Sequence, residues 1–244
     1  MNILGVIPSR YGSTRFLGKP LIDINGKTMI QRVYEQAKKS TSLSKVIVAT
    51  DDERIFNEVK HFGGEVIMTA SSHESGTERC NEVLEKSQQN FDVVVNIQGD
   101  EPFINPKQID QLCACFEDKN TDIATLVKEI KDNEELFNPN RPKVDIDENN
   151  FAKMFSRDTI PVVESVAKEE WLVRQKYYKH IGIYGYRADV LQEICKLAPS
   201  PLEIKERLEQ LRWLENSYKI KVAQTSFEAI AIDTPEDLKK ITFK

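Results

Sequence analysis

The sequence predicts an α/β protein with a Rossmann-like, mostly parallel sheet and helices on both faces of that sheet. In roughly the first 115 residues, short apolar runs alternate four times with helical patterns. This alternation is typical of parallel strands joined by crossover helices. The second half contains turn-rich patches and a strand with period-two alternation. We therefore expect a single domain over residues 1–244, with a hairpin-rich lobe inserted at about 128–185.

The elements of the first half follow from short apolar runs and helical spacing. Each expected strand is a few apolar residues long and ends at Pro, Gly or a polar turn. Strands are expected at residues 3–7, 46–49, 66–68 and 93–97. Helices are expected at residues 29–39, 55–62, 75–84 and 109–116. Asp51 and Asp52 precede the second helix, where negative charge favours a helix N-terminus.

The second half is predicted to contain more strands and two capped helices. Strands are expected at residues 123–127, 151–155, 177–186, 222–223 and 229–232. Ser200 and Glu203 form a capping box, with Pro201 at the first helical position. The long helix predicted from that point carries a leucine stripe that includes Leu208 and Leu214. A final helix is expected after Thr234.

Composition excludes several classes of protein. Lys and Arg total 34 against 39 Asp and Glu, and this acidic balance argues against a general nucleic-acid binder. No apolar run approaches the roughly 18 residues of a membrane span, and the N-terminus does not resemble a signal peptide. The four cysteines are too few for a disulfide scaffold and lack zinc spacing. We therefore expect a cytoplasmic protein without membrane insertion.

A basic loop follows the first expected strand. Residues 9–20 (SRYGSTRFLGKP) contain three cations, two glycines and no acid. Ligands of an open parallel sheet bind beyond the carboxyl ends of its strands, and cations beside exposed backbone N–H groups suit a polyphosphate. The order of residues matches neither a Walker A loop nor a dinucleotide-binding motif. The alternative interpretation is a solvated basic loop.

Two acidic positions favour a metal site. Asp100 and Glu101 follow the strand at 93–97, and Asp233 ends the last expected strand. Carboxylates that face a cationic loop suit a Mg²⁺–triphosphate, because Mg²⁺ takes hard oxygen ligands and keeps room for phosphate oxygens. Alternatively, each acid is a residue that precedes or caps a helix.

Two further patterns are consistent with a ligand pocket. His180 and Tyr184 share one face of the strand at 177–186, with Gly182 leaving space between them. Glu209 and Gln210 lie beside the leucine stripe of the predicted long helix. A half-buried strand and a solvated helix face explain the same patterns without a ligand.

Together these stretches resemble the 3-deoxy-manno-octulosonate cytidylyltransferase family over nearly the whole chain. The most specific matches are IPSRYGSTRFLGKPL (7–21), SSHESGTERCNEV (71–83), VVNIQGDEPFI (94–104), YKHIGIYGYR (178–187) and SPLEIKERLEQLRWLE (200–215). The resemblance implies transfer of CMP from CTP to the anomeric 2-hydroxyl of 3-deoxy-D-manno-octulosonate (Kdo), with release of pyrophosphate. It also implies a Mg²⁺ cofactor, a role in lipopolysaccharide synthesis, and a homodimer that forms through the second-half lobe.

The resemblance also implies roles for individual residues. It assigns catalysis to Arg10, Lys19 and Asp100, and Mg²⁺ binding to Asp100 and Asp233. The residues expected to bind the nucleotide are Pro8, Ser9, Arg10, Ser13, Arg15, Lys19, Ser75, Gly76, Thr77, Arg79 and Gly99. The residues expected to bind the sugar acid are Gln98, Arg157, His180, Tyr184, Glu209 and Gln210, with Arg157 as the candidate for its carboxylate.

Two departures from the family pattern leave the sugar acid open. Leu17 stands where the family usually has Pro, and Ala231 stands where Gly is common. A related acid, such as 8-amino-Kdo or a sialic acid, is the first alternative substrate. The second alternative is an inactive nucleotide-binding scaffold, which is disfavoured because Arg10, Lys19, Asp100 and Asp233 are all present.

Overall fold

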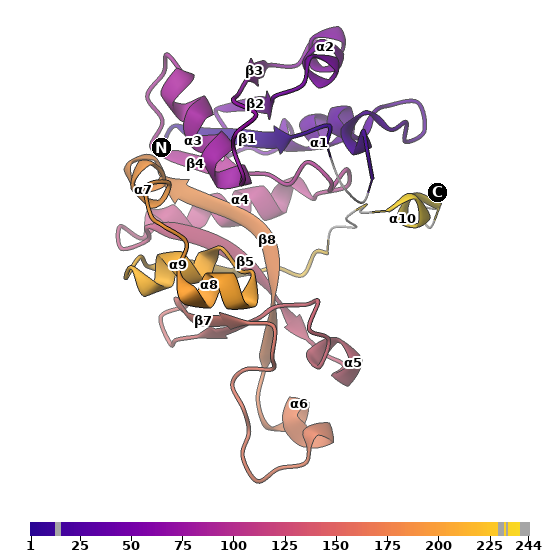
Figure 1. Ribbon diagram of the computed structural model, residues 1–244. Helices are drawn as coiled ribbons and strands as arrows, with labels where there is room; N and C mark the ends of the chain where they lie inside the picture. Colours follow the sequence, from indigo (N-terminus) through magenta and orange to yellow (C-terminus); the bar gives the residue numbers. More distant parts are fainter. Residues whose placement is uncertain (13–15, 229–231, 233, 240–244) are drawn as a thin grey trace. The chain divides into compact units, whose positions relative to one another are not determined.

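The computed structural model describes residues 1–12, 16–228, 232 and 234–239 (Figure 1). Contacts between residues group the chain into two compact units. Unit 1 comprises Met1–Cys113 and the described part of Glu228–Lys244, and unit 2 is Ala114–Phe227. The lobe predicted at 128–185 lies within unit 2 and forms only part of it.

Unit 1 is built on a parallel sheet with the order β3-β2-β1-β4. Its strands are β1 (Ile3–Ser9), β2 (Lys45–Thr50), β3 (Val66–Met68) and β4 (Val93–Asn96). Nearly every residue of β1, β2 and β4 is buried, which is typical of parallel strands covered on both faces. The four strands expected in the first half are confirmed.

Helices connect these strands, and each begins at a capping residue or proline. They are α1 (Met29–Ala37), α2 (Glu53–His61), α3 (Gly76–Lys86) and α4 (Pro106–Ala114). Thr28, Asp52 and Ser75 cap α1, α2 and α3 by accepting backbone N–H groups. Right-handed crossovers put α1 and α2 on one face and α3 on the other, because the chain crosses the sheet in the opposite direction at α3. The predicted fold class is confirmed.

The strand order creates a switch point between β1 and β4. The chain runs outward from β1 through β2 to β3 and then returns to the other side of β1. The loops that leave β1 and β4 therefore diverge, and this opens a crevice beyond the carboxyl ends of the two strands. The Ile97 N–H still donates to the Val6 carbonyl at 2.8 Å. The segments that continue from β1 and β4 therefore separate only after Ile97.

Unit 2 is built around a long antiparallel pair, β5 (Ile123–Ile130) and β8 (Tyr177–Arg187). On its other side, β5 pairs in parallel with β9 (Ile220–Gln224). A hairpin of β6 (Lys143–Ile146) and β7 (Ala152–Ser156) joins β8 through Lys143 and Lys179. The pairing of β5 with β8 shifts between Thr125 and Leu126, which is a β-bulge.

The helices of unit 2 are short. They are α5 (Asn133–Leu136), α6 (Trp171–Arg174), α7 (Ala188–Ile194), α8 (Pro201–Glu206) and α9 (Gln210–Glu215). The long helix predicted from Ser200 is wrong, because Arg207 adopts a left-handed conformation with φ 55° and ends α8. The chain restarts as α9 three residues later, and the leucine stripe spans the break.

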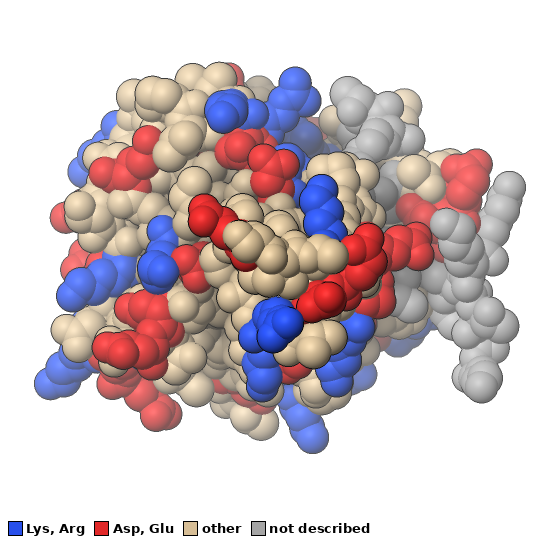
Figure 2. Space-filling view, turned by 90° about the horizontal axis from the view of Figure 1, so that it is seen from below, with Lys and Arg blue, Asp and Glu red and all other residues tan. Residues whose placement is uncertain are grey.

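The C-terminal prediction is tested only in part. Residues 229–231 of the strand expected at 229–232 lie outside the described residues, and Ile232 is not in a strand. The helix expected after Thr234 is confirmed as α10 (Pro235–Lys239). Among the described residues, no helix combines the length and apolarity needed to cross a bilayer. Figure 2 shows Lys and Arg interspersed with Asp and Glu on the face that it presents, in keeping with the net charge of −5.

Candidate active site

Unit 1 has a cavity at the switch point between β1 and β4. It has a volume of about 230 Å³. Its lining residues are Pro8, Ser9, Arg10, Lys19, Pro20, Gln98, Gly99 and Asp100. The structure therefore brings together the start of the basic loop and the segment that follows β4, as their positions in the sequence predict. Gln98, which the resemblance assigns to the sugar, lies in this cavity beside the expected phosphate ligands.

Two glycines allow the backbone to take this shape. A Cβ on Gly99 would lie 2.8 Å from the Pro8 carbonyl oxygen, so only glycine lets the ends of β1 and β4 approach so closely. Gly18 has φ 70°, and its N–H bonds to the Tyr11 carbonyl at 3.0 Å. Left-handed backbone favours glycine. The turn brings the chain back over the cavity and presents Lys19.

The cavity holds complementary charges and an unpartnered hydroxyl. Lys19 Nζ lies 2.8 Å from Asp100 Oδ2, with the two side chains 13% and 29% exposed. Ser9 is buried, and its Oγ has no hydrogen-bond partner within the described part of the chain. Because a buried polar atom without a partner is costly, Ser9 Oγ is available to bond to a ligand in the cavity.

A second cavity of about 160 Å³ shares Pro8 and Arg10 with the first. Its other lining residues are His73, Glu74, Ser75, Gly76 and Arg79. Ser75 begins α3 with a complete capping box, in which its hydroxyl accepts from the Glu78 N–H. Thr77, also expected to bind the nucleotide, is buried in the first turn of α3. The SSHESGTER segment therefore borders the same region as the basic loop.

Arg79 is held by two side chains. It is 4% exposed, bonds to Thr69 Oγ1 at 2.7 Å and pairs with Asp51 Oδ2 at 3.0 Å. The sequence pattern at Asp51 indicates only an acid at a helix start, and it does not predict this pairing. His73 was not predicted as a site residue either, although it lines the cavity and bonds to Glu82 through Nε2. The one sequence feature that pointed to His73 as a cavity residue was its position two residues before the capping box at Ser75.

The Asp100 carboxylate, which lines the switch-point cavity, suits a magnesium ion. Asp100 presents its carboxylate to the cavity, and burial together with the adjacent Asp100 charge raises the pKa of Glu101 to about 7. Mg²⁺ is usually held by one or two carboxylates, substrate phosphates and water. The described residues contain no group of three or more ligating side chains that could hold a metal, and this form of binding does not need one. Asp233, the second expected ligand, lies outside the described residues, as do Ser13 and Arg15.

Unit 2 brings together a second group of expected site residues. His180 and Tyr184 on β8 have ring centroids 5.2 Å apart, and His180 also packs edge-on against Phe155 of β7. Burial lowers the pKa of His180 to about 4, so its imidazole is neutral. Burial, followed by the charge of Glu209, raises the pKa of Tyr184 well above its usual value.

Two polar atoms of this group are buried without partners. The Tyr184 hydroxyl and Gln210 Nε2 form no hydrogen bond within the described part of the chain. A Cβ placed on Gly182 would meet no heavy atom within 4 Å, so space is open beside the backbone at Gly182. A hydroxyl-rich ligand could satisfy both polar atoms. This agrees with the sugar-binding interpretation of β8 and the start of α9.

Arg157 is bound by backbone carbonyls. Its Nε donates to the Glu206 carbonyl at 2.7 Å, and its two terminal nitrogens donate to the carbonyls of Pro139 and Arg207. These acceptors are neutral, so none of them cancels the guanidinium charge. The contacts hold the corner between α8 and α9, which leads into Glu209 and Gln210. Binding of a sugar carboxylate by Arg157 stays a prediction.

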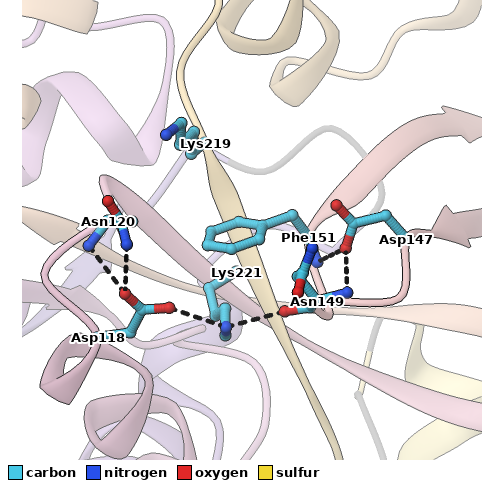
Figure 3. A pocket seen from close by; sticks show the side chains of 7 residues that line it. All are labelled: Asp118, Asn120, Asp147, Asn149, Phe151, Lys219 and Lys221. Carbon is cyan, nitrogen blue, oxygen red and sulfur yellow. Dashed lines mark hydrogen bonds and ion pairs between the residues drawn. The ribbon is translucent and has the colours of Figure 1, made fainter.

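A larger cavity lies elsewhere in unit 2 and has a volume of about 480 Å³ (Figure 3). Lys221 Nζ lies 3.0 Å from Asp118 Oδ2, donates to the Asn149 carbonyl, and sits over the Phe151 ring. The Asp147 carboxylate accepts the N–H groups of Asn149 and Phe151. These polar groups largely satisfy one another. The unpartnered Ser9 hydroxyl makes the switch-point cavity the stronger candidate despite its smaller volume.

Comparisons with known proteins found related sequences. The cytidylyltransferase family matches residues 4–220. The 3-deoxy-manno-octulosonate cytidylyltransferase of Parabacteroides distasonis is 57% identical, over 98% of this chain and 96% of its own length. The enzyme of the same name from Bacteroides thetaiotaomicron is 56% identical, over 98% and 96%.

Solved structures are also similar to this chain. CMP:2-keto-3-deoxy-manno-octonic acid synthetase complexed with CTP superposes with a TM-score of 0.91 and 40% identity, over 98% of this chain and 96% of the other. A cytidylyltransferase from Leptospira borgpetersenii serovar Hardjo-bovis has a TM-score of 0.63 and 17% identity, over 97% and 83%. That second likeness indicates a common fold only.

Proposed function

This chain belongs to the 3-deoxy-manno-octulosonate cytidylyltransferase family, and from this premise we propose that it transfers CMP from CTP to Kdo. The Kdo 2-hydroxyl oxygen forms a bond to the α-phosphorus of CTP. The bond from that phosphorus to the oxygen bridging to the β-phosphate breaks, the hydroxyl proton passes to solvent, and pyrophosphate is released. The observation that carries the proposal is the switch-point cavity, which combines two cations, a carboxylate and an unpartnered serine hydroxyl.

The residues of unit 1 are proposed to bind the nucleotide. Negative charge increases on the phosphate oxygens and on the departing pyrophosphate during transfer, so fixed positive groups stabilise the transition state. Arg10 and Lys19 supply this charge from the cavity, and Ser9 Oγ donates a hydrogen bond. The segment at Ser75 and Gly76 offers backbone groups that suit the edge of a cytosine.

Magnesium is proposed as the cofactor. Asp100 and Asp233 are the residues that would hold it. When bound, Mg²⁺ neutralises charge on the triphosphate and orients it. Lys19 Nζ lies 2.8 Å from Asp100 Oδ2, so the proposed phosphate ligand and the proposed metal ligand are side by side.

The residues of unit 2 are proposed to bind the sugar acid. Kdo carries a carboxylate and several hydroxyls, so its site needs a cation and a set of neutral or acidic partners. Arg157 is the proposed cation. His180, Tyr184, Glu209 and Gln210 are the proposed partners of the hydroxyls.

The first test is pyrophosphate release from CTP and Mg²⁺. Kdo, 8-amino-Kdo and N-acetylneuraminate are supplied in parallel, with a reaction lacking any sugar acid as the control. We expect release with Kdo only. Release with another acid alone would keep the transfer chemistry and change the substrate, whereas release with none of them would overturn the proposed function.

We also propose that the protein is a homodimer that acts in the cytoplasm, in lipopolysaccharide synthesis. Support for the dimer comes from the lobe at 128–185. Val162 and Val173 there are 64% and 83% exposed, beside a buried cluster of Ile130, Leu136, Trp171 and Tyr177. Exposed apolar side chains that gather into a patch suit an interface between subunits, and the family resemblance implies a homodimer through this lobe.

A further inference from the structure

The bulge between β5 and β8 contains a threonine, Thr125, that lies within hydrogen-bond distance of the His180 ring. Thr125 is fully buried on β5, opposite Tyr184. Leu126, the next residue, is opposite Ile181, so β8 has two extra residues at this point. Bulges leave backbone groups without ladder partners and redirect side chains, and they are frequent beside active sites.

Thr125 Oγ1 lies within hydrogen-bond distance of three groups. It is 2.8 Å from the Ile183 carbonyl, 3.2 Å from the Ile181 carbonyl and 3.0 Å from His180 Nε2. A hydroxyl has one proton to donate and two lone pairs that accept. Both carbonyls can only accept, and the Ile183 oxygen is the nearest of the three groups, so the hydroxyl proton is assigned to the Ile183 carbonyl.

The remaining contact must then run in the opposite direction. With its proton committed to a carbonyl, Thr125 Oγ1 can only accept from His180, so Nε2 carries the hydrogen. A neutral imidazole has one protonated nitrogen, and therefore Nδ1 is left with a lone pair. No residue in the described part of the chain bonds to Nδ1 of His180.

We propose that Thr125 is a positioning residue that holds His180 as the Nε2–H tautomer, so that Nδ1 accepts a hydrogen bond from a hydroxyl of the sugar acid. The ligand half of this inference rests on the proposed function. The tautomer half rests only on the bulge geometry. Thr125 does not touch the ligand and acts through the ring that it orients.

The tautomer is measured without substrate. The chain has three histidines, so ring ¹⁵N labelling gives few signals, and His180→Gln assigns those of His180. We expect a protonated Nε2 and an unprotonated Nδ1 at pH 7. A protonated Nδ1 in the wild-type protein would overturn the proposal, whether or not the enzyme accepts Kdo.

Substitution then separates positioning from folding. Thr125→Val removes the hydroxyl and keeps the branched shape, and Thr125→Ser keeps the hydroxyl. Thr121→Val is a matched control, because Thr121 is also fully buried and donates to a backbone carbonyl, that of Cys115, at 2.9 Å. Thermal melting of all three variants shows how much each loses in stability.

We expect Thr125→Val to lose the single tautomer and to raise the KM for Kdo by roughly tenfold, the effect of one lost hydrogen bond. The KM for CTP should stay within about twofold in Thr125→Val. Thr125→Ser should show the wild-type His180 tautomer and the wild-type KM for Kdo, and Thr121→Val should change neither the tautomer nor that KM. An unchanged tautomer and Kdo KM in Thr125→Val would overturn the proposal. If that variant fails to fold, the wild-type spectrum and Thr125→Ser still decide the tautomer.

Discussion

Buried polar side chains in this protein divide into those that have hydrogen-bond partners within the described residues and those that are left to bind a ligand. Ser9 Oγ, the Tyr184 hydroxyl and Gln210 Nε2 are buried and have none among the described residues. All three were expected site residues. Lys143, by contrast, is fully buried but donates to the carbonyls of Asn138 and Arg157, so its cation supports the structure around Arg157.

Asp100 is the residue whose loss should be most damaging to activity. We expect Asp100→Asn to lower turnover at least ~100-fold, because it removes the charge of the proposed metal ligand and leaves Lys19 without its carboxylate partner. The thermal midpoint should change little, since the side chain lies at the edge of a cavity. Pyrophosphate release measures the effect. Asp189→Asn, at an exposed position on α7, is the control, and near-normal turnover of Asp100→Asn would contradict the metal assignment.

His180 should remain neutral over the working range of pH. Burial lowers its pKa to about 4, against about 6.5 in an unfolded chain. Between these values the unfolded chain binds the extra proton, so this contribution to stability is present above about pH 6.5 and is lost as the pH falls toward 4. Ring ¹⁵N signals of His180 should be unchanged from pH 8 to about 5. A titration midpoint near 6.5 would contradict this account.

At the scale of elements, two glycines have opposite surroundings. A Cβ on Gly99 would lie 2.8 Å from the Pro8 carbonyl oxygen, whereas one on Gly182 would meet nothing within 4 Å. We expect Gly99→Ala to cost about 1–3 kcal/mol of stability by overpacking and to weaken CTP binding. Gly182→Ala should keep the thermal midpoint and raise the KM for Kdo. Each variant is the control for the other, and a wild-type Kdo KM in Gly182→Ala would mean that no ligand occupies that space.

The break between α8 and α9 also makes a prediction about stability. Arg207 is exposed and adopts a left-handed conformation with φ 55°, which costs a non-glycine residue about 1–2 kcal/mol. Arg207→Gly should therefore raise the free energy of unfolding by up to ~1 kcal/mol in urea melts. Lys205→Gly, within α8, should lower it by about as much. Equal losses in both variants would show that the bend is not strained.

At the scale of the whole molecule, the lobe at 128–185 is expected to join two copies of the chain. Val173→Glu places a charge on a side chain that is 83% exposed, and Ile204→Glu does so at a 67% exposed position on α8, outside that lobe. Light scattering of the eluting protein should give a dimer mass for wild type and Ile204→Glu, and a monomer mass for Val173→Glu. A monomeric wild-type protein would remove the proposed interface.

The sequence alone determined the parallel sheet of unit 1, the position of the basic loop after β1 and the position of the acidic residues after β4. It could do so because buried strands and capped helices leave periodic local patterns, and because the carboxyl ends of parallel strands meet at one edge. The motifs QGDEP and KHIGIYGYR, taken together with the other matching stretches, were also specific enough to indicate the family. These features depend on residues close together in the chain.

Only the tertiary structure decided how side chains distant in sequence are partnered. The bend at Arg207 is held by Arg157, fifty residues earlier, and the tautomer of His180 depends on Thr125, fifty-five residues earlier. The pairing of Arg79 with Asp51 was equally invisible. A hydrogen bond between strands leaves no period in the sequence, because the register and the bulge that bring its two atoms together are properties of the packed sheet.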